Sequence, residues 1–263
     1  MMSRTRYVCI GYGFFGFGLM GLLSSLPPAS LSQKPATPPA ARPPIVERIT
    51  EHLYRVGAAM VDTQARTVTC PGVINMHDGP IEYLAVAPRG KLHESLLRVD
   101  IRPLYLQTAL LMLDLEPKNV LKQQGDRATP QGDPVELRIR WRDLQGEQQD
   151  VRAEDLILEM PGSKPMPTHN WVFTGSRILK DVGFEADVEK SLVAVWHDPA
   201  AILDNPLPGG ANNAYVVNPK RTPKQGTAVE FVLKAIPPAP ANAGKEPEPP
   251  SGGKLGGKPG DKP

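Results

Sequence analysis

Apolar and polar residues alternate along much of the middle of the chain, which is the pattern of β-strands with one buried face. In the clearest case, segment 135–142, Val135, Leu137, Ile139 and Trp141 are expected to face the core while the intervening Glu and Arg side chains face water. Similar runs predict further strands. These runs are 52–61, 66–70, 81–87, 95–99, 150–158, 171–179, 182–188, 192–196, 214–217 and 227–236.

Turn-forming residues between the runs predict how the strands connect. Pro71 and Gly72 predict a turn after the second strand, and the polar segment 118–133 is expected to be a loop. Two pairs of neighbouring runs predict hairpins. These pairs are 135–142 with 150–158 and 182–188 with 192–196.

One segment, 102–115, has helical spacing instead. Leu104, Leu111 and Leu115 recur on one face, and Pro103 suits the first turn of a helix. A helix this apolar must pack against another layer, most simply a sheet. Because strands and helices do not alternate regularly, the sequence predicts an α+β fold: a predominantly antiparallel β single domain with one main helix.

An abrupt corner follows the apolar run 192–196. Asp198 before Pro199 is typical of a helix start, and residues 200–203 would make about one turn. Asp204 and Asn205, before a proline, would end that turn. The corner is therefore expected to be firm and to present a polar loop, 207–213, at the surface.

Composition separates the ends of the chain from its middle. Seven of the 30 prolines lie between positions 27 and 44, and eight lie between 237 and 263. Such segments bury too little apolar surface to offset the entropy lost on ordering. We expect a Pro-rich linker at 33–44, a domain at 45–236, and a disordered Pro/Gly/Lys-rich tail at 237–263.

The N-terminus has the features of an export signal. Arg4 and Arg6 precede an uncharged, largely apolar stretch, 7–26, and small residues follow near position 30. We expect a signal peptide at 1–32 with cleavage after Ser32; an uncleaved membrane anchor is the alternative. Either places the domain in the periplasm or extracytoplasmic envelope, and the membrane would be a partner only through the anchor.

Charge and cysteine usage narrow the function classes further. The net charge is +2 and no basic stripe with interleaved aromatics occurs, so nucleic acid is not expected as a partner. Removal of residues 1–32 would leave Cys70 as the single cysteine. Its alternating surroundings favour a buried core residue; the alternative is an intermolecular link.

Three histidines are followed directly by a carboxylate, in His77-Asp78, His93-Glu94 and His197-Asp198, and these pairs are the candidates for metal or acid–base chemistry. Adjacent strand residues point to opposite faces, so each pair could supply only one ligand. In the alternative interpretation, His93 and Glu94 fix a turn and Asp198 caps a helix. The candidate residues for a ligand or polar site are His93, Glu94, His169, Ser176, His197, Asp198, Asp204 and Asn205, and those for a divalent metal are His93, His197 and Asp198.

Two further sites can be composed from these residues. One is a calcium site of oxygen ligands, but it lacks the spacing of a calcium-binding loop. Its members would be Asp198, Asp204, Asn205, Asn212 and Asn213. The other is a hydrolytic triad of Ser176, His197 and Asp204, without the nucleophile motif of a hydrolase.

The order of several motifs resembles one known family. The motifs are Ile81-Glu-Tyr-Leu, Lys91-Leu-His-Glu-Ser-Leu-Leu97, the leucine-rich helix, Trp171-Val-Phe-Thr-Gly-Ser176 and Val195-Trp-His-Asp-Pro-Ala-Ala-Ile-Leu-Asp-Asn-Pro206. In this order they resemble the YdjY-type domain of bacterial envelope proteins, from about Val73 to Leu233. The resemblance implies no catalytic residues, because the family is largely of unknown function. Some relatives resemble ferredoxin-associated proteins, but this chain lacks the cysteines of an iron–sulfur cluster.

The sequence favours an exported envelope protein with a non-catalytic binding domain. Its partner would be another envelope protein or a small ligand, and no cofactor is evident. The alternative is a metal-dependent or acid–base enzyme that uses the residues around 93–94 and 197–198. A divalent metal would belong to that alternative.

Overall fold

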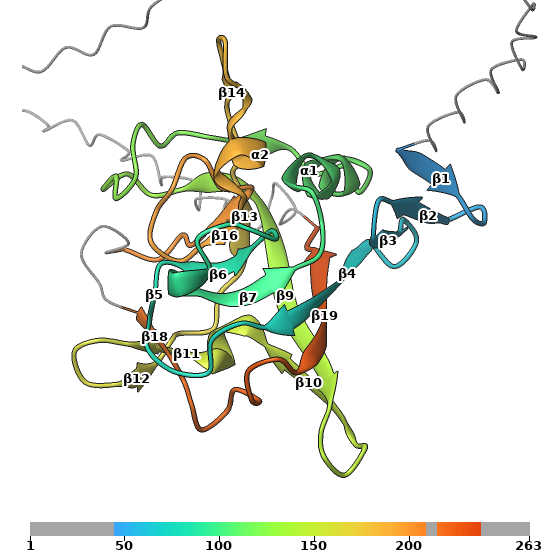
Figure 1. The fold of residues 1–263 in the computed structure, drawn as a ribbon. Helices are drawn as coiled ribbons and strands as arrows, with labels where there is room; N and C mark the ends of the chain where they lie inside the picture. The colour runs from blue at the N-terminus through green and yellow to red at the C-terminus, as the bar shows by residue number, and fades with distance from the viewer. Residues whose placement is uncertain (1–44, 209–214, 238–263) are drawn as a thin grey trace, which may run out of the picture. The chain divides into compact units, whose positions relative to one another are not determined.

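Eight strands of the chain close into a ring, which we call the barrel (Figure 1). The computed structural model describes residues 45–208 and 215–237. In ring order the strands are β4 (Thr67–Ile74), β19 (Ala228–Ala235), β9 (Gln131–Arg142), β13 (Trp171–Phe173), β17 (Leu203–Asp204), β16 (Ser191–Ala194), β6 (Tyr83–Val86) and β7 (Ser95–Val99), and β7 pairs back with β4. The β6–β7 and β16–β17 pairs are parallel and the other pairs antiparallel, so the fold is predominantly antiparallel as predicted, but the sheet is mixed and closed.

Shorter strands extend the barrel. On the β4 side lie β3 (Ala59–Asp62), β2 (Leu53–Val56) and β1 (Val46–Arg48); β10 (Gln148–Arg152) and β8 (Pro117–Lys118) pair with β9. A second sheet has the order β12 (Lys164–Pro165), β11 (Ile157–Glu159), β18 (Tyr215–Val217) and β5 (Pro80–Ile81). The strands β14 (Ile178–Leu179) and β15 (Gly183–Phe184) pair only with each other. Two short 3-10 helices are η1 (Leu92–Glu94) and η2 (Ala153–Leu156).

The core follows the predicted alternation. Val135, Leu137 and Ile139 of β9 are fully buried, and apolar residues of β4, β7 and β19 share the same cluster. Trp141 continues this face of β9 but is only partly buried, because it lies near the end of the strand. Cys70 is buried and free, and burial raises the pKa of its thiol to about 12. The prediction of a core cysteine is confirmed.

The main helix is α1 (Pro103–Leu111), shorter than the predicted 102–115. It ends early because the chain turns after Leu111, and Asp114 takes a left-handed φ of 56°. Its N-terminus is capped from α2 (Glu185–Glu189): Asp187 Oδ1 accepts a hydrogen bond from Leu104 N at 3.0 Å. A carboxylate at this position also suits the positive end of the helix dipole.

The predicted turn at Pro71 and Gly72 is wrong, because β4 runs through both residues. Proline lacks an N–H group, but the Pro71 carbonyl accepts from Asp100 N at 2.8 Å. At Gly72 the neighbouring strand lies so close that a Cβ atom would be 2.8 Å from the Arg98 carbonyl oxygen. Glycine therefore permits the pairing that closes the barrel.

The predicted hairpins are only partly correct. Segment 135–142 pairs with β10 as expected, but β11 leaves for the second sheet. The hairpin of 182–188 with 192–196 is wrong, because most of the first run belongs to α2 and β16 pairs with β6 and β17. Segment 171–179 is interrupted after Phe173, where Gly175 takes a φ of +65°.

The predicted leader 1–32, the linker 33–44 and all but the first residue of the tail 237–263 lie outside the described residues. Neither helix within the described ranges has the length and apolarity needed to cross a lipid bilayer.

Candidate functional site

The predicted corner, residues 198–205, is held by several hydrogen bonds, but it lies inside the protein. No helix follows Asp198: the chain turns and enters β17 at Leu203. The Asp198 side chain accepts from Ala200 N at 2.9 Å, and its own N–H group donates to Asp204 Oδ2 at 2.9 Å. Asp204 and Asn205 are completely buried. The expected helical turn and the surface position of this corner are both wrong, since short polar side chains here satisfy backbone groups of an interior turn.

The oxygen atoms of this corner are already bonded to the protein. Asp204 Oδ1 accepts from Asn205 N at 2.7 Å, and Asn205 Nδ2 donates to the Val195 carbonyl at 3.1 Å and the Tyr215 hydroxyl at 3.2 Å. Burial raises the pKa of Asp204 well above its usual range, and the nearby Asp198 adds to that shift. The further residues of the calcium hypothesis, Asn212 and Asn213, lie outside the described part of the chain.

Asp198 joins a second set of polar groups around the phenol of Tyr83. The Tyr83 hydroxyl donates to Asp198 Oδ2 at 2.7 Å, and Lys91 Nζ donates to the Tyr83 oxygen at 2.7 Å. Ser191 Oγ lies 3.4 Å from the same carboxylate oxygen. Burial and the Asp198 carboxylate raise the pKa of Tyr83. The phenol therefore stays protonated and serves as a donor rather than as a base.

Two other predicted residues lie near this cluster, at its rim. Glu94 and His93 are neighbours of Glu82, whose pKa is raised by burial first and then by Glu94. The His93 ring is 79% exposed and lies 3.5 Å from Glu94 Oε2. Gln124 Nε2 closes the rim by donating to Glu82 Oε2 at 3.1 Å and to the Tyr83 oxygen at 3.2 Å. The structure thus brings His93, Glu94 and Asp198 into one neighbourhood.

The members of the suggested triad have separate partners. His197 Nδ1 lies 2.7 Å from the Asp126 carbonyl, so this nitrogen is the donor, and its Nε2 is buried without a partner. Ser176 Oγ accepts from Ala186 N at 2.9 Å. No hydrogen bond joins Ser176, His197 and Asp204 to one another within the described ranges.

His169 stands apart from the other predicted residues. Its Nδ1 donates to the Pro167 carbonyl at 2.9 Å and lies 3.8 Å from Glu154 Oε1. Its ring centroid is 5.1 Å from that of Trp171. Burial lowers the pKa of His169. Within residues 45–208 and 215–237, no three His, Cys, Asp or Glu residues gather in a group that could hold a metal ion.

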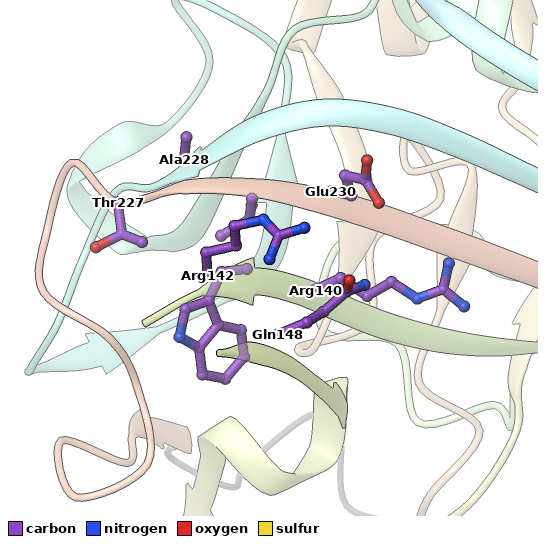
Figure 2. Close-up of a pocket in the computed structure, with 8 residues that line it drawn as sticks. Arg140, Arg142, Gln148, Thr227, Ala228 and Glu230 are labelled. Carbon is purple, nitrogen blue, oxygen red and sulfur yellow. The ribbon is translucent and has the colours of Figure 1, made fainter. Parts of the chain in front are cut away.

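A different surface offers a more open site, around Trp141 at the end of β9. Two depressions, of about 450 and about 430 Å³, share Trp141, Arg142 and Thr227 in their walls, and we call them together the Trp141 groove. Figure 2 shows Arg140 and Arg142 on β9, with Glu230 on β19 and Thr227 just before that strand across the first depression. The second depression is completed by the loop that precedes β19.

The second depression is rich in positive charge. Lys220 and Lys224 are exposed and have no carboxylate partner among the described residues, and Arg142 donates only to the Gly146 carbonyl, at 3.0 Å. The acidic residue in its wall, Asp143, accepts hydrogen bonds from backbone groups of its own turn. These cations around a partly buried indole favour a ligand with negative charge.

One further atom in the second depression lacks a partner. The side chain of Thr222 lines it, and the Thr222 hydroxyl is buried without a hydrogen bond. A buried hydroxyl in a native protein is usually bonded, whereas this group is an unsatisfied donor beneath the wall of the depression among the described residues. Sequence reasoning missed the groove because its parts come from separate segments. The signal that could have indicated it is Lys220-Arg221 and Lys224 in a short loop beside a Trp-Arg strand end.

Comparisons with known proteins give one match. The family model described as the YdjY domain matches residues 59–234, which include both the Tyr83–Asp198 cluster and the Trp141 groove. Neither the curated proteins nor the solved structures contain a match to the chain.

Proposed function

The chain belongs to the YdjY domain family, and from this premise we propose that it is a non-catalytic binding domain that holds an anionic ligand in the Trp141 groove. One observation carries the proposal: Arg142, Lys220 and Lys224, which have no carboxylate partner among the described residues, line the same depression as the Trp141 indole. These groups come from β9 and from the loop before β19, so the barrel holds both walls in place.

The alternative of an acid–base or metal-dependent enzyme has less support. Asp198 and Asp204 are buried and bonded to neighbouring groups, and His197 donates to a backbone carbonyl. The protonated phenol of Tyr83 already donates to Asp198. These contacts leave few polar atoms free to act on a substrate.

We place this binding domain outside the cytoplasm, with an envelope protein or a small ligand as its partner. The support is the basic, then apolar, then small-residue pattern of the N-terminus. Expression of the full chain in a bacterium, followed by N-terminal sequencing of the product from the envelope fraction, tests this part. The expected mature start is Gln33. A full-length product in the cytoplasm would contradict export, and a full-length product in the membrane would favour an anchor.

Nuclear magnetic resonance tests the binding site directly. The ¹⁵N-labelled protein is titrated with three anions: polyglutamate, heparin fragments and phosphatidylglycerol vesicles. At least one should shift the signals of the Trp141 indole N–H and the Thr222 amide, and Arg142→Gln with Lys220→Gln should remove the shifts. Lys180→Gln, in the turn between β14 and β15, is the control and should retain them. If no anion shifts these signals, the proposed function is wrong.

A further inference from the structure

The pairing between β9 and β19 stops before either strand ends. The last pair in register is Arg140 with Glu230, yet β9 continues to Arg142 and β19 begins at Ala228. In the same register Trp141 would pair with Val229 and then Arg142 with Ala228, and neither pair forms. The two strands therefore diverge, and the first depression of the Trp141 groove lies between them.

Backbone hydrogen-bonding groups face this opening. In an antiparallel ladder every second residue directs its N–H and C=O groups toward the same neighbour. Ile236 N donates to the Pro134 carbonyl, so even-numbered positions of β9 and β19 face each other. Arg142 and Ala228 are also even-numbered positions, so their N–H and C=O groups face the opening. Such free strand edges are the surfaces to which extended peptides add.

The positive charge of the groove favours acidic peptides over other extended peptides. The cations Arg142, Lys220 and Lys224 lie in the walls of the groove beside the free hydroxyl of Thr222. Carboxylate side chains of a bound peptide would find donors there without displacing an existing ion pair, because these three cations have no carboxylate partner among the described residues.

We infer that the ligand of the Trp141 groove is an acidic peptide segment in extended conformation. Its backbone pairs with the diverging edges of β9 and β19, and its carboxylates meet the cations of the adjoining depression. This inference rests on the proposed function and narrows the ligand to one chemical class. A glycan or lipid of the same charge would use the cations but not the strand edges.

Fluorescence anisotropy with a labelled, end-blocked heptapeptide of alternating Glu and Thr tests the inference. Three matched peptides serve as controls. One has Lys in place of Glu, and the other two keep the Glu sequence and carry methyl groups on alternate backbone nitrogens, one peptide for each register. We expect the Glu peptide to bind, and at least one methylated register to bind about tenfold more weakly, because methylation removes backbone donors. The Lys peptide should not bind.

Protein variants locate the site. Arg142→Gln should weaken binding of the Glu peptide about twofold to fivefold, the range of a single exposed charge contact, and Lys180→Gln should leave binding unchanged. Unchanged thermal unfolding of Arg142→Gln would confirm that the variant is folded. If both methylated peptides bound as tightly as the unmethylated Glu peptide, the inference would be overturned. Binding of heparin or vesicles alone, lost in Arg142→Gln, would overturn the peptide while the proposed function stands; the absence of any binding would overturn both.

Discussion

The hydroxyl of Tyr83 donates a hydrogen bond of 2.7 Å to Oδ2 of Asp198, a residue 115 positions further along the chain. Both residues are buried, and Lys91 Nζ donates to the same phenol oxygen. This contact joins β6 to the corner that follows β16, so the polar motif of the sequence stabilises the barrel wall from within.

Removal of this hydroxyl should destabilise the protein. Tyr83→Phe removes the short hydrogen bond to buried Asp198 Oδ2 and the acceptor of Lys91 Nζ, which costs about 1–3 kcal/mol of unfolding free energy. Urea denaturation followed by circular dichroism measures the loss. The matched control is Tyr54→Phe, whose hydroxyl bonds the Glu51 carbonyl near the surface and whose loss should cost less than about 0.5 kcal/mol. Equal losses of unfolding free energy in the two variants would mean that the buried hydrogen bond contributes no more to stability than the surface one.

Stability should depend on pH through Asp204. Its folded pKa is raised by burial, so its contribution is full below the unfolded pKa and declines as the pH rises toward the folded value. In Asp204→Asn this decline should be absent. The variant should also lose about 1–3 kcal/mol at low pH, because its amide replaces an oxygen that accepts a backbone hydrogen bond.

Urea titrations between pH 4 and pH 8 on wild type and variant measure this difference. Asp181→Asn, at an exposed turn, is the control and should follow the wild-type curve. Parallel curves for wild type and Asp204→Asn would show that Asp204 does not titrate differently on folding.

Gly132 should tolerate no side chain. Its φ is +142°, and a Cβ atom there would lie 1.9 Å from the Phe173 carbonyl oxygen, where β9 meets β13. Gly132→Ala should lower the unfolding free energy by about 3–5 kcal/mol. Gly146→Ala is the comparison: it also has a positive φ but no atom within 4 Å, so it should cost about 1 kcal/mol. Thermal unfolding of both variants checks the contrast, and similar costs would refute the close approach.

Cys70 should be inert in the folded protein. Its thiol is completely buried and burial raises its pKa to about 12, so almost no thiolate exists at pH 8. In a Cys9→Ser background, Cys70 is the single cysteine, and a thiol-specific reagent should modify it only after urea unfolds the chain. Rapid labelling in native buffer would show that this part of β4 opens readily.

The sequence predicted those strands and helices that have a regular pattern of apolar and polar residues within their own segment. β19 and residues 135–142 of β9 were placed correctly because alternation over eight or more residues specifies a strand with one buried face. The start of β9 at Gln131 was missed, since residues 131–133 were predicted to belong to a loop. The main helix was recognised but extended too far, since its end depends on the turn at Asp114. Pro71 and Gly72 usually mark turns, but here pairing with β19 and the approach of β7 keep both residues in a strand.

The candidate site was harder to predict. Asp198 was expected to cap a helix, but its carboxylate instead bonds Tyr83, whose position relative to the corner depends on the whole barrel. The Trp141 groove combines a strand end with the loop around Thr222, and neither segment alone indicates a site. The closed ring of strands was not predicted either, because its parallel pairs join segments with no distinguishing pattern.

The place of β19 between β4 and β9 has a consequence for how the molecule is made. β19 is the last strand of the described residues, yet it joins the earliest part of the barrel to its middle. The barrel therefore cannot close until β19 has been made, since contacts between distant segments form slowly and depend on both partners being present. Until then β4 and β9 each keep an unpaired edge, and such edges make a folding chain prone to aggregation.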